Sequence, residues 1–511
     1  MGRRNHVVLL IYLRDYYSQY HTSKFSVFDC PDDTASVPRC QPLVEFWSEV
    51  EGKTVPEEGQ DTPEYADIQA TKIAWPRTVI RVNERREEVE NLVPYFAGII
   101  RGGIQAQTDE FYRMFRDWTN IQTLDISRIG EWSLTDECFR HLTNLHSLDM
   151  SRCDQPTITD KAFSHLSNLR HLNMGDCTQT TITDEAFHHL QNLNSVSVFW
   201  WTDISEEAFS YLPNLEALDI HRVRTTKITD DGFRHLSNLK TLLMSDTTFH
   251  TYRRDYTALS DKAFHHLKEL RYLDISSCQQ TAITDEAFRF MSNLEKLNIS
   301  SCVQTTITDE SFSHLPKLTS LNMDLCSQRT ITGAGFRYLT QLRSLSMFAC
   351  MQDTITTRGF RHLSLLTKLN MRKCQQTTLT DTDFRCLTNL RWLNMCECNE
   401  TTITDELFQH MKNLKSLYMY KCNQPTISGK GFQHLSNLEC LCIRNCRNIK
   451  LTPQNFQSLS RLKYLDIAGC NQSRVTNETF QNSKSLEMVW ASSPAPREAF
   501  SHLTTVTVKD A

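Results

Sequence analysis

The chain has 511 residues, with 55 lysines and arginines against 60 aspartates and glutamates, a formal charge of −5 and a pI near 6.4. This balance offers no general attraction for nucleic acid or anionic lipid, since both favour a strong basic excess. No apolar run approaches the roughly 18 residues of a bilayer-spanning helix. We therefore expect neither a nucleic acid nor a membrane among the partners.

The first part of the chain is the least informative. Residues 1–72 form a poorly defined N-terminal segment with loop-like stretches at 29–42 and 54–67. Within it, the apolar run 7–13 predicts a buried strand or helix. A secretory signal is the alternative, but charged residues follow at once and no small-x-small cleavage site appears. Residues 73–104 have apolar periodicity and are expected to cap the domain that follows.

One pattern recurs throughout residues 105–511. If the phenylalanine of each copy is taken as the marker, all but three of the steps between copies are 24 residues. A fixed period of this size is typical of a solenoid, in which stacked repeats share one continuous core. We predict about 16 repeats of 24 residues. The markers are Phe115, Phe139, Phe163, Phe187, Phe209, Phe233, Phe264, Phe288, Phe312, Phe336, Phe360, Phe384, Phe408, Phe432, Phe456 and Phe480, with a shortened copy at Phe500.

The hydrophobic period changes within each repeat. In ITDKAFSHLSNL an apolar residue recurs every three positions, which predicts a short helix or 3₁₀ turn. Thr159 is a natural N-cap for this helix, and Asp160 places negative charge at its positive end. In the following HLNM the period becomes two, with Leu172 and Met174 on one side, which is typical of a strand. Repetition of helix and strand in one direction makes the strands parallel.

Cysteines mark the repeats as well. The pattern L-x-x-L-x-M-x-x-C-x-x-x-T-I-T-D resembles the cysteine-containing leucine-rich repeats of F-box and related regulatory proteins. This resemblance covers about residues 105–511. It implies an α/β fold, a right-handed leucine-rich-repeat horseshoe with a parallel sheet on the concave side and short helices on the convex side. Eleven of the 18 cysteines lie fourteen residues after a marker phenylalanine: Cys153, Cys177, Cys278, Cys302, Cys326, Cys350, Cys374, Cys398, Cys422, Cys446 and Cys470.

We interpret these cysteines as buried free thiols. Neighbouring strands are close enough for disulfides, but equivalent side chains in a stack project in parallel and their number is odd. Free thiols favour a reducing compartment and hence a cytoplasmic or nuclear location. Four Asn-x-Ser/Thr triplets mildly oppose this interpretation, although such triplets arise easily in a threonine-rich repeat.

Three polar positions also repeat. Glutamines two residues after the cysteines predict a ladder of amides that bond from copy to copy. Histidines two residues after the phenylalanines lie on the convex side, where no accompanying acids or thiols complete a metal site. Asp or Asn occupies the concave position ten residues after the phenylalanine in ten copies, and we interpret it as a solvated polar row.

Two regions depart from the repeat. In the fourth copy we expect Phe199 to be exposed on the concave face and Trp201 to lie in the core. The sixth copy carries seven extra residues within 246–259, a loop that presents Arg253 and Arg254. Aromatic and arginine side chains of this kind are enriched in binding hot spots.

The second departure lies on later strands, where large side chains replace Ser, Thr and Asp. A cluster of aromatic and basic residues on one curved surface predicts a protein-binding patch, with unselected drift between copies as the alternative. Single-stranded nucleic acid also binds such mixtures, but the acidic concave row and the net charge argue against it. The predicted positions are Phe348, Lys368, Arg372, Trp392, Tyr418, Tyr420, Arg444 and Tyr464.

The sequence contains no phosphate loop, nucleophile elbow, H-E-x-x-H or C-x-x-C motif. We expect no enzyme activity and no cofactor. The predicted function is a scaffold that binds a protein on its concave face. The first alternative is a substrate-recognition subunit of a cullin-type ubiquitin ligase, with a degenerate F-box in residues 1–75 that docks to a cullin adaptor. The second alternative is a secreted recognition receptor.

Overall fold

The structure is a computed structural model of the chain. It describes residues 9–10, 122–127, 134–177, 179–200, 204–223, 227–245, 259–278, 282–302, 304–350, 355, 359–374, 379–398, 402–472, 475–492, 497–501 and 507–510.

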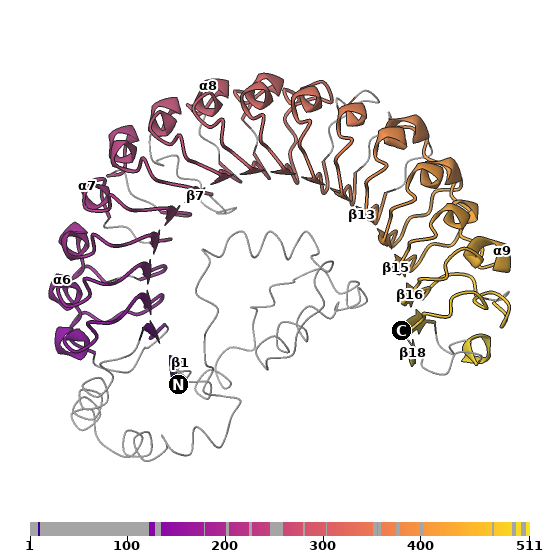
Figure 1. The fold of residues 1–511 in the computed structure, drawn as a ribbon, viewed down its shortest axis with the longest axis horizontal. Coiled ribbons are helices and arrows are strands. Elements are labelled where there is room, and N and C mark those ends of the chain that lie inside the picture. Colours follow the sequence, from indigo (N-terminus) through magenta and orange to yellow (C-terminus); the bar gives the residue numbers. More distant parts are fainter. Residues whose placement is uncertain are drawn as a thin grey trace, which may run out of the picture.

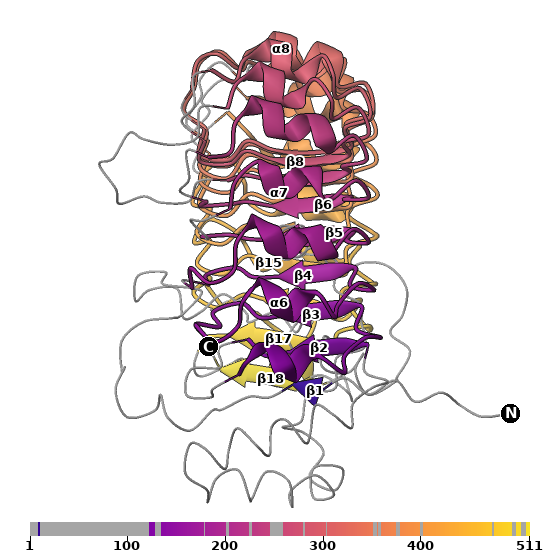
Figure 2. The same ribbon diagram turned by 90° about the vertical axis from the view of Figure 1, so that its left-hand side faces the viewer.

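The strands form one parallel sheet in which each strand lies beside the next along the chain. Figure 1 shows the strands on the inner side of a horseshoe, and Figure 2 shows β2 to β6 as successive rungs. The strands are Leu9–Leu10 (β1), Thr123–Asp125 (β2), Ser147–Asp149 (β3), His171–Asn173 (β4), Ser195–Ser197 (β5), Ala217–Asp219 (β6), Thr241–Leu243 (β7), Tyr272–Asp274 (β8), Lys296–Asn298 (β9), Ser320–Asn322 (β10), Ser344–Ser346 (β11), Lys368–Asn370 (β12), Trp392–Asn394 (β13), Ser416–Tyr418 (β14), Cys440–Cys442 (β15), Tyr464–Asp466 (β16), Met488–Ala491 (β17) and Thr507–Asp510 (β18).

Short helices cover the outer side of the horseshoe (Figure 1). The predicted alternation of helix and parallel strand is therefore confirmed, and so is the solenoid fold class. The α-helices are Asp160–Phe163 (α6), Glu207–Ser210 (α7), Asp285–Phe288 (α8) and Pro453–Phe456 (α9). The 3₁₀ helices are Asp136–Phe139 (η1), Asp184–His189 (η2), Asp230–His235 (η3), Asp261–Phe264 (η4), Asp309–His314 (η5), Gly335–Tyr338 (η6), Phe360–His362 (η7), Asp381–Cys386 (η8), Asp405–His410 (η9), Lys430–His434 (η10) and Arg497–Phe500 (η11).

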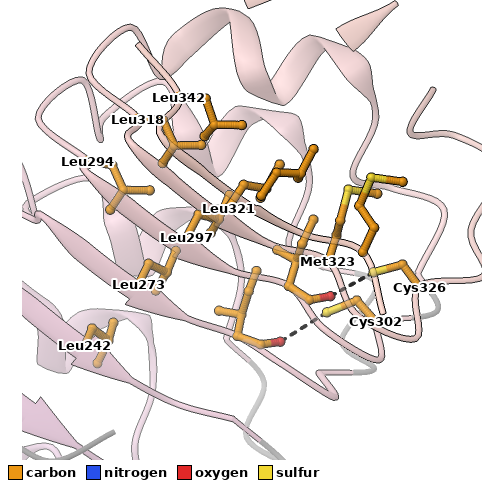
Figure 3. Packing of buried hydrophobic residues seen from close by; sticks show 14 of the residues in the cluster. Leu242, Leu273, Leu294, Leu297, Cys302, Leu318, Leu321, Met323, Cys326 and Leu342 are labelled. Atoms are coloured by element: carbon orange, nitrogen blue, oxygen red, sulfur yellow. Dashed lines mark hydrogen bonds between the residues drawn. The ribbon is translucent and has the colours of Figure 1, made fainter. Parts of the chain in front are cut away.

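The core is one continuous layer between the sheet and the helices. The central residue of each strand pairs in register with its equivalent, as Leu297 does with Leu321, and both side chains are buried (Figure 3). The marker phenylalanines of the described residues, from Phe139 to Phe500, are also buried, and Phe336 stacks on Phe360 with ring centroids 6.2 Å apart. Burial of each such side chain stabilises the folded state by about 2 kcal/mol. The core therefore grows with every repeat.

The cysteines form the predicted column of free thiols. The Cys326 thiol donates to the Ile299 carbonyl at 3.1 Å and the Cys302 thiol to the Ile275 carbonyl at 3.2 Å (Figure 3). Burial raises the pKa of Cys326 to about 12. All cysteines of the described residues are free thiols. Nine thiols of the column donate to a carbonyl of the preceding repeat, so the column is structural; they are Cys177, Cys302, Cys326, Cys350, Cys374, Cys398, Cys422, Cys446 and Cys470.

The glutamines behave differently from the prediction. The backbone N–H of Gln155 donates to the side-chain oxygen of Gln179 at 2.7 Å, and Gln424 Nε2 donates to the Cys398 carbonyl at 3.2 Å. The expected amide-to-amide ladder is therefore wrong for these residues. A buried amide next to a turn bonds the backbone groups that the turn leaves open.

Of the buried strand or helix predicted for residues 7–13, the structure describes the strand Leu9–Leu10 (β1), which pairs with β2 at the N-terminal edge of the sheet. The remainder of the predicted segments 1–72 and 73–104 lies outside the described residues. In the described part of the chain, no helix has the length and apolar character that crossing a bilayer requires.

Candidate protein-binding face

Each repeat presents three side chains to the concave side. Side chains alternate along a strand, so Leu417 and Met419 point into the core whereas Ser416, Tyr418 and Tyr420 point to the opposite face. The predicted binding residues occupy these positions on neighbouring strands, because Lys368, Trp392, Ser416, Cys440 and Tyr464 are joined in register from β12 to β16. We call the following set the C-terminal concave patch: Phe348, Lys368, Arg372, Trp392, Tyr418, Tyr420, Arg444 and Tyr464.

Three of these side chains are buried, which corrects the prediction that they are exposed. Trp392 is 8% exposed and Tyr420 is 3% exposed. The Trp392 ring lies 5.6 Å from the Tyr418 ring, and Tyr420 packs with Cys396 and Cys442. Strands stack about 4.8 Å apart, so large side chains on consecutive rungs cover one another. Their position was predicted correctly, but their exposure was not.

Arg444 is the third buried residue. Its Nε lies 2.9 Å from Asp466 Oδ2, and both side chains are buried. A buried ion pair of this kind contributes little net stability but is costly to break, because removal of one partner leaves the other charge unpaired. Arg444 therefore has a structural role between neighbouring repeats, and its guanidinium is an unsuitable contact for a partner.

The other residues of the patch are half-buried. Phe348 is flanked by two cations, with the Arg372 guanidinium 5.6 Å and the Lys373 ammonium 5.8 Å from its ring centroid. Glu397 joins the same group, because its carboxylate lies 2.9 Å from Arg372 and 3.8 Å from Lys373. Sequence reasoning missed Lys373 and Glu397, although both immediately precede a cysteine of the column.

Phe199 is half-buried rather than exposed. Its ring stacks on His221 with centroids 4.6 Å apart and an interplanar angle of 12°. It also lies over Gly175, where an added Cβ would be 1.9 Å from Phe199 Cε1. The absence of a side chain at Gly175 creates the space that the ring fills. Trp201, Arg253 and Arg254 lie outside the described residues, so their predicted places stay predictions.

Trp200 was missed as a surface residue. It is 41% exposed, and the Arg222 guanidinium lies 5.1 Å from its ring centroid. The position before each cysteine of the column has a left-handed backbone, and so do the equivalent positions Trp200, with φ of 61°, and Arg222, with φ of 56°. This conformation turns the side chain away from the core, which the alternation of the strand does not reveal.

We expected the Asp and Asn residues of the concave face to form a solvated row, but their side chains are hydrogen-bonded within the sheet. Asn298 Oδ1 accepts a hydrogen bond from the Ser300 amide at 3.0 Å, and Asn298 Nδ2 donates to Asp274 Oδ2 at 2.9 Å. Burial raises the pKa of Asp274. Asp and Asn favour such bonds to the backbone two residues on, which form turns. These side chains therefore form the turn at the end of each strand and hydrogen-bond to the equivalent side chain of a neighbouring strand.

Comparisons with known proteins agree with this architecture. The family described as BspA type Leucine rich repeat region matches in 6 copies over residues 156–256, 202–343 and 257–390. A second family, Leucine rich repeat, matches residues 119–178 and 388–447. The chain is a leucine-rich-repeat protein. No curated protein matches it in sequence.

Solved leucine-rich-repeat structures show the same fold. A leucine-rich-repeat protein of Leptospira interrogans is 21% identical, with 78% of this chain and 97% of that chain covered and a TM-score of 0.59. A chain of the TLR13–ssRNA13 complex is 20% identical, with coverage of 77% and 64% and a TM-score of 0.56. A chain of the Drosophila Toll–Spatzle complex is 16% identical, with coverage of 76% and 55% and a TM-score of 0.54. These likenesses show the fold alone.

Proposed function

We propose that the protein is a non-catalytic scaffold that binds another protein on the C-terminal concave patch. The half-buried members Phe348, Lys368, Arg372, Tyr418 and Tyr464 support this function, since they lie on neighbouring strands of one curved face. Aromatic and arginine side chains dominate protein-binding hot spots. The formal charge of −5 favours a protein over a nucleic acid as the partner.

The arrangement of Phe348 and Arg372 gives this proposal its main support. The guanidinium is held between the Phe348 ring and the Glu397 carboxylate, at 5.6 Å and 2.9 Å respectively. A side chain that is ordered before binding loses less conformational entropy when a partner arrives. Tyr464 is held in a similar way, because its hydroxyl donates to Glu487 at 3.1 Å.

A cytoplasmic or nuclear location belongs to the same proposal. The free thiols of Cys302, Cys326 and Cys350 lie in one column of neighbouring repeats. A reducing compartment keeps such thiols free.

The second candidate is a substrate-recognition subunit of a cullin-type ubiquitin ligase. It is favoured by the resemblance of the cysteine-containing repeats to those of F-box proteins. Apart from Leu9–Leu10, the degenerate F-box predicted in residues 1–75 lies outside the described residues. Recovery of a cullin adaptor with the full chain would support this candidate, and failure to recover one would leave the scaffold without a ligase role.

The proposed function is tested by affinity purification of the full chain from cells that express it, with quantitative mass spectrometry. We expect Phe348→Ala combined with Tyr464→Ala to lose the specific partner. The matched control is His265→Ala combined with Phe290→Ala, a ring pair with centroids 4.3 Å apart on the helix side of the repeat. Loss of the partner in the control but not in the concave variant would contradict the proposal.

A further inference from the structure

The acidic residues are unevenly distributed along the chain. Residues 29–67 contain 11 acidic and 2 basic residues, whereas the remaining 472 residues contain 49 acidic and 53 basic ones. The negative charge of the whole chain therefore arises from this one stretch. A segment of such high charge density and low apolar content favours contact with a surface of opposite sign.

A surface of opposite sign lies on the concave face. From β12 to β15 the concave positions and the residues just after them carry Lys368, Arg372, Lys373 and Lys421, together with Arg444, which is already paired with Asp466. Glu397 is the one acidic residue at these positions, and its carboxylate pairs with both Arg372 and Lys373, so the positive charges there still outnumber the negative one. We call Lys368, Arg372, Lys373 and Lys421 the basic arc.

A hydrogen-bond donor within the same region lacks an acceptor. The Tyr420 hydroxyl is buried and has no hydrogen-bond partner among the described residues. A buried hydroxyl without a partner costs roughly 1–3 kcal/mol. The Lys421 ammonium lies 5.0 Å from the Tyr420 ring centroid, so a carboxylate that pairs with Lys421 would lie close to this ring. The ammonium favours a carboxylate-bearing occupant.

The length of the intervening chain permits the acidic stretch to reach the basic arc. The chain is tied to the N-terminal edge of the sheet at Leu10, which pairs with Asp125. Residue 29 lies nineteen positions after Leu10, and this length of chain spans up to about 65 Å when extended. The ten strand steps from β2 to β12 measure about 48 Å along the arc at about 4.8 Å each. The return from residue 67 to residue 122 is longer still.

We propose that the acidic stretch 29–67 binds the basic arc within the same chain. The stretch lies outside the described residues, so the proposal rests on its sequence, on the described surface and on the tether at β1. A tethered segment has an effective concentration in the millimolar range, so weak contacts suffice. If a partner protein binds the same concave face, as proposed above, the acidic stretch competes with it for that face. The binding of the stretch itself does not depend on the proposed function.

The test is zero-length cross-linking of the full chain with a carbodiimide at low ionic strength, followed by peptide mapping. We expect amide bonds between the carboxylates of residues 29–67 and Lys368, Lys373 or Lys421, and at least a fivefold loss of these links in 1 M salt, because salt screens exposed charges. A mixture of isotopically light and heavy chains identifies which links are intramolecular.

Charge reversal provides the matched comparison. Lys368→Glu combined with Lys421→Glu should remove most links to residues 29–67, whereas Lys161→Glu combined with Lys317→Glu, both exposed and remote from the basic arc, should leave them unchanged. If Lys161 and Lys317 are linked to the stretch as often as the basic arc, or if the links join only light to heavy chains, the proposal is overturned. The wild-type map decides the question even if a variant fails to fold. No partner is needed, so this outcome is independent of the capture experiment.

Discussion

The carboxylate of Asp309 accepts two hydrogen bonds from Thr332 of the next repeat, one from its amide at 2.7 Å and one from its hydroxyl at 2.6 Å. The same hydroxyl accepts a hydrogen bond from the Ala334 amide at 3.1 Å, just before the following helix. Asp285 and Thr308 form the equivalent pair one repeat earlier. The repeated T-D of the sequence is therefore a joint between repeats, which explains its recurrence without any catalytic role.

Replacement of Asp309 by alanine should destabilise the protein by about 2 kcal/mol, because hydrogen bonds to a charged group contribute roughly 1.5–3 kcal/mol. The free energy of unfolding from urea denaturation measures the effect. The exposed Asp231 is the matched control, and Asp231→Ala should change stability by less than about 0.5 kcal/mol. Equal effects of the two substitutions would show that the joint between repeats is energetically unimportant.

The buried thiols should resist alkylation in the folded protein. Burial raises the pKa of Cys177, Cys326 and Cys470 to about 12 in each case, and the thiolate is the reactive form. At pH 8 we expect iodoacetamide to modify the half-buried Cys386 and Cys440 well before these three. Mass spectrometry of a time course measures the order. Early modification of Cys326 without unfolding would contradict the column of buried thiols.

Stability should fall as the pH rises above 9. The pKa of Cys326 is raised from 9.0 to about 12, so between these values the unfolded chain releases a proton that the folded chain retains. A raised folded-state pKa contributes stability below the unfolded value and loses it as pH rises. We expect a loss of about 1 kcal/mol per such thiol between pH 9 and 10. Cys326→Ala should show a smaller loss than the wild type over this interval, and an identical loss would refute the assignment.

Leu325 combines exposure with a strained backbone. It is 46% exposed and has a φ of 56°, a left-handed conformation that costs a residue other than glycine roughly 1 kcal/mol. Leu325→Gly should therefore raise the thermal midpoint, whereas Leu325→Ala, which keeps the strain, should not. Differential scanning calorimetry compares the two. A lower midpoint for the glycine variant would mean that the Leu325 side chain contributes stability that its exposure does not suggest.

The repeat period made most of the fold predictable. Phe163 and Cys177 recur with the same spacing from copy to copy, so their environments repeat and the pattern of one copy predicts the others. The exposure of Trp392 and Tyr420 was not predictable, because it depends on which side chains occupy the rungs beside them. The pairing of Asp309 with Thr332 was missed for a related reason, since it joins groups that are adjacent only after stacking.

The left-handed residues show a further limit. The pattern of strand alternation ends before Trp200, so neither its exposure nor its contact with Arg222 follows from the period. Glu397 is a similar case, because its role depends on Arg372 in the neighbouring repeat. Side chains that act across repeats need the three-dimensional register, which the linear pattern supplies only for positions that are nearly invariant among copies.

Binding of a partner protein to the C-terminal concave patch is tested by the affinity of the purified partner for the full chain. After the partner is identified by mass spectrometry, isothermal titration calorimetry should show at least a tenfold weaker affinity for Phe348→Ala combined with Tyr464→Ala, because hot-spot truncations cost 2 kcal/mol or more, roughly. His265→Ala combined with Phe290→Ala should bind as the wild type does. Unchanged affinity in the concave variant, with its thermal unfolding also unchanged, would contradict the account.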